Sequence, residues 1–258
     1  MTRARAHRDG GTPDPGADGD ALIRALRASL RAQADAARAP RMQAYMKSAM
    51  PYWGVPSPAQ RRIFRAVFAA HPLADAASWR ATMLTLWRTA ERREERYGAI
   101  ALADGRRYRR FEDLAALPVY EEWIVTGAWW DYVDTIASRR LGALLEREPT
   151  VMPAIMRAWA TDPVLWKRRA AILCQLRFRA KTDRALLYDC IAPNLEGSEF
   201  GREFFMRKAI GWALRTYARV DPDEVLRYVR AHADRLSGLS KREALKHVLP
   251  ADAIAGLR

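Results

Sequence analysis

The segment SPAQRRIFRAVF, residues 57–68, carries the clearest secondary-structure signature in the chain. Ser57 stands before a proline at the first helical position, and Gln60 follows three residues later, a pattern typical of a helix N-terminus. Apolar residues then recur at three- and four-residue steps, as Ile63 and Val67 do, so that they share one face of a helix. The segment therefore predicts a short helix with one buried face.

The same pattern continues along the chain from about residue 20 onward. Alternating runs of β-branched residues are absent, and the periodicity predicts helices of roughly 8–18 residues joined by short turns. Asp162 and Asp221 each precede a proline, which predicts a capped helix start at both places. The expected breaks fall at Pro51–Pro58, His71–Pro72, Gly105, Pro118, Gly127, Glu148–Pro149, Asp162–Pro163, Gly197, Asp221–Pro222 and Gly238.

Short helices with short connections indicate antiparallel pairs stacked one after another. The predicted fold is therefore all-α, a HEAT-like helical-repeat solenoid with a concave basic groove. No literal repeat is present in the letters, so a globular helical bundle is the alternative. The expected organisation is a disordered N-terminal tail over residues 1–20, rich in Gly, Pro and Asp, and one repeat domain over residues 21–258.

The charge balance points to a polyanionic partner, because the 258-residue chain has a formal net charge of +14. Residues 1–20 contain three Arg and four Asp, so the positive excess belongs to the predicted domain. A membrane surface is the rival polyanion. Since no apolar run is long enough to span a bilayer and no secretory signal is recognisable, we expect a cytoplasmic protein.

Metal and nucleotide chemistry find no support in the sequence. Cys174 and Cys190 fit no zinc spacing, and the four histidines form no HxxxH pair. No P-loop and no GxGxxG motif occurs. We therefore predict neither a metal nor a cofactor.

The segment EEWIVTGAWWDYVDTI, residues 121–136, is the most informative for function. Gly127 ends one helix and a new helix starts shortly after it. Trp130 and Asp134 are four residues apart and share one helical face, whereas Trp129, Val133 and Ile136 share another that is expected to be core. Either Trp130 or Asp134 alone could be structural, but an aromatic ring beside a carboxylate on one face favours a site.

Two further segments add basic and aromatic residues. In WKRRAAIL, residues 166–173, Trp166 and Arg169 share a face; Arg168 and Arg169 cannot point the same way, so one is expected to reach phosphate and the other solvent. In FFMRKAIGWALR, residues 204–215, Trp212 lies near Lys208 and Arg215 on one face. Gly211 in mid-helix is unfavourable by about 1 kcal/mol relative to Ala, which indicates a close approach by another group.

Such a cluster suits the excision of a cationic base. A purine alkylated at a ring nitrogen is already an activated leaving group, so the enzyme needs to stabilise the developing sugar cation and to position a water. A carboxylate at Asp134 can do both, and Trp130 and Trp212 attract a cation through their ring faces. In a positive groove, Asp134 is expected to keep a low pKa and stay ionised.

These segments resemble the AlkD-like DNA alkylation repair family of HEAT-like repeat DNA glycosylases. The resemblance runs from about Leu22 to about Val248 and includes the motifs AYMK at residues 44–47 and SKREA at residues 240–244. It implies a catalytic carboxylate at Asp134, with Trp130 and Trp212 forming an aromatic cleft. It implies DNA contacts from Tyr45, Lys47, Arg169, Lys208 and Arg215.

The resulting prediction is a monomeric, monofunctional DNA N-glycosylase of base excision repair. It is expected to act on double-stranded DNA containing alkylated bases and to be associated with the bacterial nucleoid. Its expected substrates are cationic N3- or N7-alkylated purines in DNA, such as 7-methylguanine and 3-methyladenine, which it is expected to excise without a deep base-flipping pocket. The alternative is a non-catalytic helical-repeat protein that binds distorted or branched DNA. A scaffold for an acidic protein partner is a third interpretation.

Overall fold

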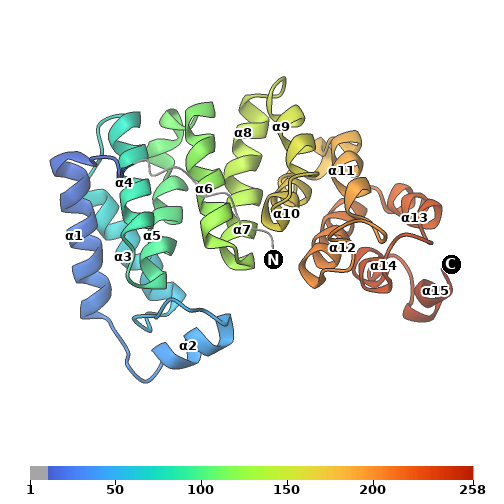
Figure 1. Cartoon of the computed structure of the whole chain (residues 1–258), viewed down its shortest axis with the longest axis horizontal. Coiled ribbons are helices and arrows are strands. Elements are labelled where there is room, and N and C mark those ends of the chain that lie inside the picture. Colours follow the sequence, from blue (N-terminus) through green and yellow to red (C-terminus); the bar gives the residue numbers. More distant parts are fainter. Residues whose placement is uncertain (1–10, 258) are drawn as a thin grey trace. The chain divides into compact units, whose positions relative to one another are not determined.

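The computed structural model describes residues 11–257, and every regular element within them is helical (Figure 1). No β-strand occurs in this part of the chain, and short helices follow one another through short connections, which confirms the predicted all-α helical-repeat class. The chain forms two compact units, the first ending at Glu112 and the second beginning at Asp113.

In unit 1, α1 packs against α3, α4 and α5, and α4 packs against α5. Its interior is apolar, with the side chains of Leu22, Leu26, Trp79 and Trp87 almost completely buried. The helices of unit 1 are α1 (Gly16–Ala32), α2 (Ala39–Met46), α3 (Ser57–Ala70), α4 (Ala76–Arg88) and α5 (Arg93–Ala103).

The folded part of unit 1 begins earlier than the sequence predicted. Helix α1 starts at Gly16, and Gly19 is buried within it. Thr85 Oγ1 also donates a hydrogen bond of 2.8 Å to the carbonyl of Pro13. Residues 16–20 therefore belong to the fold rather than to the tail predicted for residues 1–20, of which residues 1–10 lie outside the described chain.

Of the three predicted helix starts, at Ser57, Asp162 and Asp221, only Asp221 caps its helix through its side chain. Asp221 accepts a hydrogen bond from Glu224 N and caps α13 (Pro222–Ala231), as predicted. Ser57 begins α3 but makes no capping bond, because Pro56 occupies the cap position; the Gln60 side chain donates instead to the Val55 carbonyl, at 2.7 Å. Asp162 accepts a hydrogen bond from Val164 N before α10 (Leu165–Leu173), and so stabilises the preceding turn rather than capping the helix.

In unit 2, α12 packs extensively on α14 and also against α10 and α13. The first of its elements are α6 (Leu117–Gly127), α7 (Trp130–Thr135), α8 (Gly142–Arg147), α9 (Met152–Trp159) and α10 (Leu165–Leu173). The remaining helices are α11 (Arg184–Ile191), α12 (Phe204–Ala218), α13 (Pro222–Ala231), α14 (Gly238–Leu245) and α15 (Ala251–Ala255).

Helices α7 and α8 are joined without a break by a π-helical segment, Ile136–Leu141. The widened turns follow directly after Asp134, and such segments are frequent at functional sites. Gly142 lies at the end of this segment, where a Cβ atom would stand 2.9 Å from the carbonyl oxygen of Cys174. Glycine therefore allows the residues that follow α10 to pack closely on the helix that carries Asp134.

A second close approach joins α12 to α14. A Cβ atom on Gly211 would lie 2.5 Å from the Cβ of Glu243 and 3.0 Å from the carbonyl oxygen of Ser240. The sequence indicated that Gly211 admits another group at close range, and that group is helix α14. The contact fixes where the Glu243 side chain enters the site described below.

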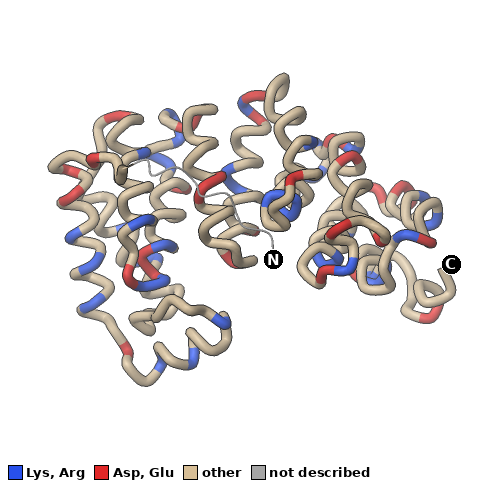
Figure 2. Tube along the Cα trace, viewed as in Figure 1, with Lys and Arg blue, Asp and Glu red and all other residues tan. Residues whose placement is uncertain are grey.

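Charged residues of both signs lie on helices of both units (Figure 2). The positive excess of the chain therefore includes side chains held on folded helices, such as Arg169 and Arg215 in unit 2. Among residues 11–257, none of the helices combines the length and the apolar character that a membrane span requires.

Candidate active site

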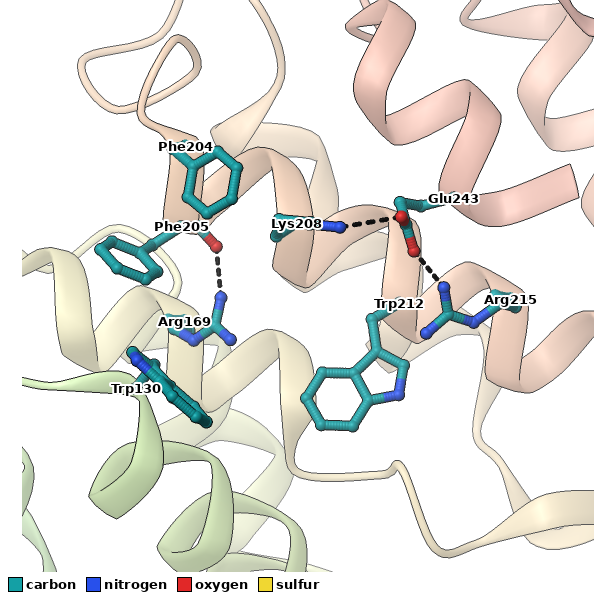
Figure 3. A pocket seen from close by; sticks show the side chains of 8 residues that line it. All are labelled: Trp130, Arg169, Phe204, Phe205, Lys208, Trp212, Arg215 and Glu243. Carbon is teal, nitrogen blue, oxygen red and sulfur yellow. Dashed lines mark hydrogen bonds and ion pairs between the residues drawn. The ribbon is translucent and has the colours of Figure 1, made fainter. Parts of the chain in front are cut away.

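Unit 2 contains a pocket of about 300 Å³ to which helices α7, α10, α12 and α14 contribute (Figure 3). It combines aromatic walls with three basic side chains and one carboxylate. The lining residues are Trp130, Arg169, Phe204, Phe205, Lys208, Trp212, Arg215 and Glu243. Five residues that the sequence singled out from three separate segments, namely Trp130, Arg169, Lys208, Trp212 and Arg215, are therefore brought to one place.

The two predicted tryptophans form opposite parts of the pocket wall. Trp130 is the first residue of α7, whereas Trp212 lies in the middle of α12 (Figure 3). Both side chains are half-buried, so each ring keeps a surface that a ligand can touch. Both rings therefore line the same pocket.

An aromatic cluster supports the pocket near the start of α12. The ring centroid of Phe205 lies 5.4 Å from that of Trp129 and 5.1 Å from that of Trp166. Trp129, expected in the core, is only half-buried and packs within this cluster. Phe204 stands edge-on to Phe205 and is 51% exposed, so the pocket also has an exposed aromatic side chain that sequence reasoning did not assign.

Asp134 is held by a two-pronged ion pair with Arg169. Arg169 Nε donates to one carboxylate oxygen and Nη2 to the other, each at 2.8 Å. The third nitrogen of the guanidinium, Nη1, donates to the backbone carbonyl of Phe205. Side-chain exposure is 5% for Arg169 and 13% for Asp134, and only Arg169 is among the pocket-lining residues. The Asp134 carboxylate thus lies behind the pocket wall, where it is hydrogen-bonded to the wall residue Arg169.

The pKa of Asp134 differs from expectation. The sequence predicted a low pKa in a positive groove, but burial raises the pKa of Asp134 above its ordinary value of 3.8. The hydrogen bonds and the charge of Arg169 act in the opposite direction, and the nearby Asp131 adds to the rise. Desolvation wins because the carboxylate has little contact with water.

The basic run around Arg169 is buried rather than solvated. Arg168 is 7% exposed and donates to Glu199 Oε2 at 2.8 Å. Lys167 is 9% exposed and pairs with Glu121 at 2.7 Å and with Asp162 at 2.5 Å. The prediction that one of the two arginines points into solvent was therefore wrong, because Arg168 pairs with Glu199, which is 31 residues away in the sequence.

On α12, Lys208 and Arg215 converge on one carboxylate, that of Glu243 from α14 (Figure 3). Lys208 Nζ donates to Oε1 at 2.8 Å, and Arg215 Nη1 donates to Oε2. The Lys208 hydrogen bond, followed by that of Arg215, holds the pKa of Glu243 below its ordinary value. Glu243 belongs to the SKREA motif, yet sequence reasoning gave it no role.

Tyr45 and Lys47 lie in unit 1 and are not among the residues that line this pocket. Tyr45, near the end of α2, is 77% exposed, which is unusual for so large an aromatic side chain. Lys47 follows α2 with a left-handed backbone, φ 49°, and its side chain is exposed. Both residues are thus open to a ligand.

The chain is similar to proteins associated with DNA repair. A family model described as "DNA alkylation repair enzyme" matches residues 26–248, a range that contains every pocket residue. A solved structure, described as a predicted DNA alkylation repair enzyme from Enterococcus faecalis, superposes with a TM-score of 0.75 and 27% identity. The match covers 85% of this chain and 98% of that one. No curated protein matches the chain.

Proposed function

The chain belongs to the DNA alkylation repair enzyme family, and from this premise we propose that it is a monofunctional DNA N-glycosylase. Its proposed substrates are purines in double-stranded DNA that carry a positive charge after alkylation at N3 or N7. The proposed reaction is hydrolysis of the glycosylic bond, which leaves an abasic site for base excision repair.

The observation that carries the proposal is the Asp134–Arg169 pair beside an aromatic pocket. Asp134 follows Trp130 by one helical turn, so the carboxylate and the ring lie on the same side of α7. In a poorly hydrated setting a fixed negative charge stabilises a developing cation more strongly than it would in water. Arg169 holds the carboxylate in one orientation without the motion that would weaken this effect.

Asp134 retains the capacity to orient a water molecule. A carboxylate offers about four lone-pair directions, and Arg169 occupies two of them. A water held by a remaining lone pair would attack the sugar carbon as the bond to the base breaks, and the proton that this water loses would pass to the Asp134 carboxylate. Because the alkylated base leaves as a neutral molecule, no proton donor to the base is needed, and the pocket lining contains no histidine or cysteine.

DNA binding is proposed to involve both units. Lys208 and Arg215 would contact backbone phosphates next to the lesion, while Trp130 and Trp212 would contact the lesion nucleotide. Tyr45 and Lys47 are proposed to contact the duplex from unit 1, on the strength of their exposure. The net charge of +14 favours such binding, because neutralised phosphates release their counterions.

The test is release of free base from a duplex that contains 7-methylguanine. We expect release well above the spontaneous rate, and we expect the Asp134→Asn variant to lose about 100- to 1000-fold of it, the usual effect of removing a pre-organised electrostatic group. Duplex binding by Asp134→Asn is expected to persist. The matched control is Asp189→Asn, which removes an exposed ion pair with Arg157 outside the pocket and should leave release unchanged.

Two outcomes would redirect the proposal. Binding without release, at any lesion tested, would favour the alternative of a non-catalytic protein that recognises distorted or branched DNA. Equal activity of folded Asp134→Asn and the unmodified protein would remove Asp134 from the mechanism. The absence of any salt-dependent affinity for duplex would point instead to an acidic protein partner.

A further inference from the structure

Glu243 is the one carboxylate among the residues that line the pocket, and it occupies an unexpected place for a surface that binds DNA. It lies between Lys208 and Arg215, the two basic side chains of α12 that face the pocket (Figure 3). Its side chain is 19% exposed, and Lys246 approaches it from the same helix at 4.0 Å. A carboxylate here repels a phosphate that would bind the same two cations.

The position of Glu243 is fixed by the packing of α14 on α12. Gly211 lets the Glu243 backbone approach so closely that an added Cβ would lie 2.5 Å from the Cβ of Glu243. The start of α14 is held by Ser237, which caps the helix, and by Ser240 Oγ, which donates to the Arg207 carbonyl at 3.0 Å. The carboxylate therefore cannot move far from the two cations by a shift of its helix.

The cations keep hydrogen-bonding capacity beyond what Glu243 uses. An ammonium has three N–H donors and a guanidinium has five, and one from each is directed to Glu243. Lys208 is 38% exposed, so its remaining donors face water. A phosphate oxygen can thus bind Lys208 or Arg215 while Glu243 remains nearby, but only against the repulsion of a neighbouring negative charge.

We infer that Glu243 is a specificity-determining counter-ion that competes with DNA phosphates for Lys208 and Arg215 and so weakens the binding of undamaged DNA at this pocket. The inference rests on the proposed DNA binding and does not depend on base release. With Glu243 ionised, the group formed by the three side chains carries one net positive charge instead of two. A cationic base in the pocket is attracted by the same carboxylate that opposes the phosphate.

Discrimination between damaged and undamaged duplex follows from this opposition. Lys208 and Arg215 alone would hold any backbone, because every nucleotide carries the same phosphate. The Glu243 charge lowers that common contribution and, in addition, favours the duplex that presents a positive base. Removal of the charge should therefore raise affinity for undamaged DNA more than affinity for alkylated DNA.

The experiment measures affinity for undamaged and 7-methylguanine-containing duplexes at several salt concentrations with Glu243→Gln. For undamaged duplex we expect about two- to fivefold tighter binding at low salt, the range of a partly exposed charge pair. The slope of log affinity against log salt should steepen by up to about 0.9, the value for one additional phosphate contact. The ratio of affinities for damaged and undamaged duplex should fall.

Three control variants separate charge from structure. Glu146→Gln removes an exposed carboxylate near Lys181, outside the pocket, and should leave the salt slope unchanged. Glu243→Asp keeps the charge and should retain the slope of the unmodified protein. In a Lys208→Gln/Arg215→Gln background, Glu243→Gln should have no further effect on the slope, since the cations for which it competes are absent.

Weaker binding of undamaged duplex by folded Glu243→Gln, or an unchanged salt slope, would overturn the inference. If Glu243→Gln does not fold, Glu243→Ala serves as the second variant, because it keeps the Cβ that packs at Gly211. A steeper slope without base release from any lesion would support the inference and reject the glycosylase proposal. Normal base release with an unchanged slope would do the reverse.

Discussion

The α7 side of the pocket and the α12–α14 side each pair basic side chains with one carboxylate, but they differ in burial. On the α7 side, the side chains of Arg169 and Asp134 are 5% and 13% exposed. Two guanidinium nitrogens of Arg169 donate hydrogen bonds to the two carboxylate oxygens of Asp134. On the α12–α14 side, Lys208 is 38% exposed and shares Glu243 with Arg215. The first group is largely shielded from water, whereas Lys208 leaves the second group partly exposed to it.

Because of this difference in burial, the pKa values of the two carboxylates shift in opposite directions. Desolvation dominates at Asp134 and raises its pKa, whereas hydrogen bonds from Lys208 and then Arg215 dominate at Glu243 and lower its pKa. A closed pair fixes geometry, as chemistry at a lesion requires. An open cluster keeps its charges available, as an exchangeable contact with DNA requires. The α7 side is therefore suited to a fixed geometry, and the α12–α14 side is suited to contacts that DNA can exchange.

The largest expected effect on the free energy of unfolding comes from a substitution that breaks the Asp134–Arg169 ion pair. Arg169→Met leaves the Asp134 carboxylate buried without its partner, and removal of one member of a buried pair commonly costs about 3–5 kcal/mol. Lys208→Met removes a cation that is already partly solvated, and there we expect less than about 1 kcal/mol. Urea denaturation of both variants measures the difference in free energy of unfolding. If both variants lost the same free energy of unfolding, the two sides of the pocket would not differ in the way that their burial predicts.

A smaller effect concerns the packing that holds Glu243 in place. Gly211→Ala introduces a methyl group 2.5 Å from the Glu243 Cβ, and such overpacking costs about 1–3 kcal/mol. The better helix propensity of alanine offsets about 1 kcal/mol of this. Gly238→Ala is the matched control, because its nearest neighbour is the flexible end of Arg242 at 3.2 Å. Thermal melting should show a lower Tm for Gly211→Ala and no loss for Gly238→Ala.

The smallest effect is the pH dependence of stability, which should have opposite signs on the two sides. Asp134 has a raised pKa, so its contribution to stability is present below pH 3.8 and declines as the pH rises through its folded-state pKa. Glu243 has a lowered pKa, so its contribution is present above pH 4.5 and declines as the pH falls through its folded-state pKa.

Difference curves isolate these contributions. The free energy of unfolding of the unmodified protein minus that of Asp134→Asn should decrease with rising pH just above 3.8. The corresponding difference for Glu243→Gln should increase with rising pH just below 4.5. Two curves of the same slope would show that burial does not separate the two carboxylates.

Much of the architecture could be predicted because it depends on local patterns. The periodicity of Ile63 and Val67 corresponds to buried positions in α3, and Asp221 with the proline after it starts α13. Trp130 and Trp212 could be selected because adjacent or four-spaced residues define a helical face. These signals extend over a few residues, the range in which backbone geometry alone relates one side chain to another.

The partnerships across helices could not be predicted in the same way. Asp134 and Arg169 were both chosen, but as a catalytic group and a phosphate contact, since nothing in their own segments pairs them. Glu121 and Glu199, the distant acidic partners of Lys167 and Arg168, were missed for the same reason. For Glu243 a signal did exist: Gly211 in mid-helix indicated a close neighbour, though not which one.

The forked contact of Arg169 with Asp134 and with the Phe205 carbonyl has a consequence for how this protein can change over generations. Its three donors reach from α10 to two other helices, and a lysine at this position has one nitrogen for the same three acceptors. A change at residue 134 or residue 169 alone leaves a buried charge unmatched. The two positions are therefore expected to be inherited as a unit, so that a descendant would keep both or replace both.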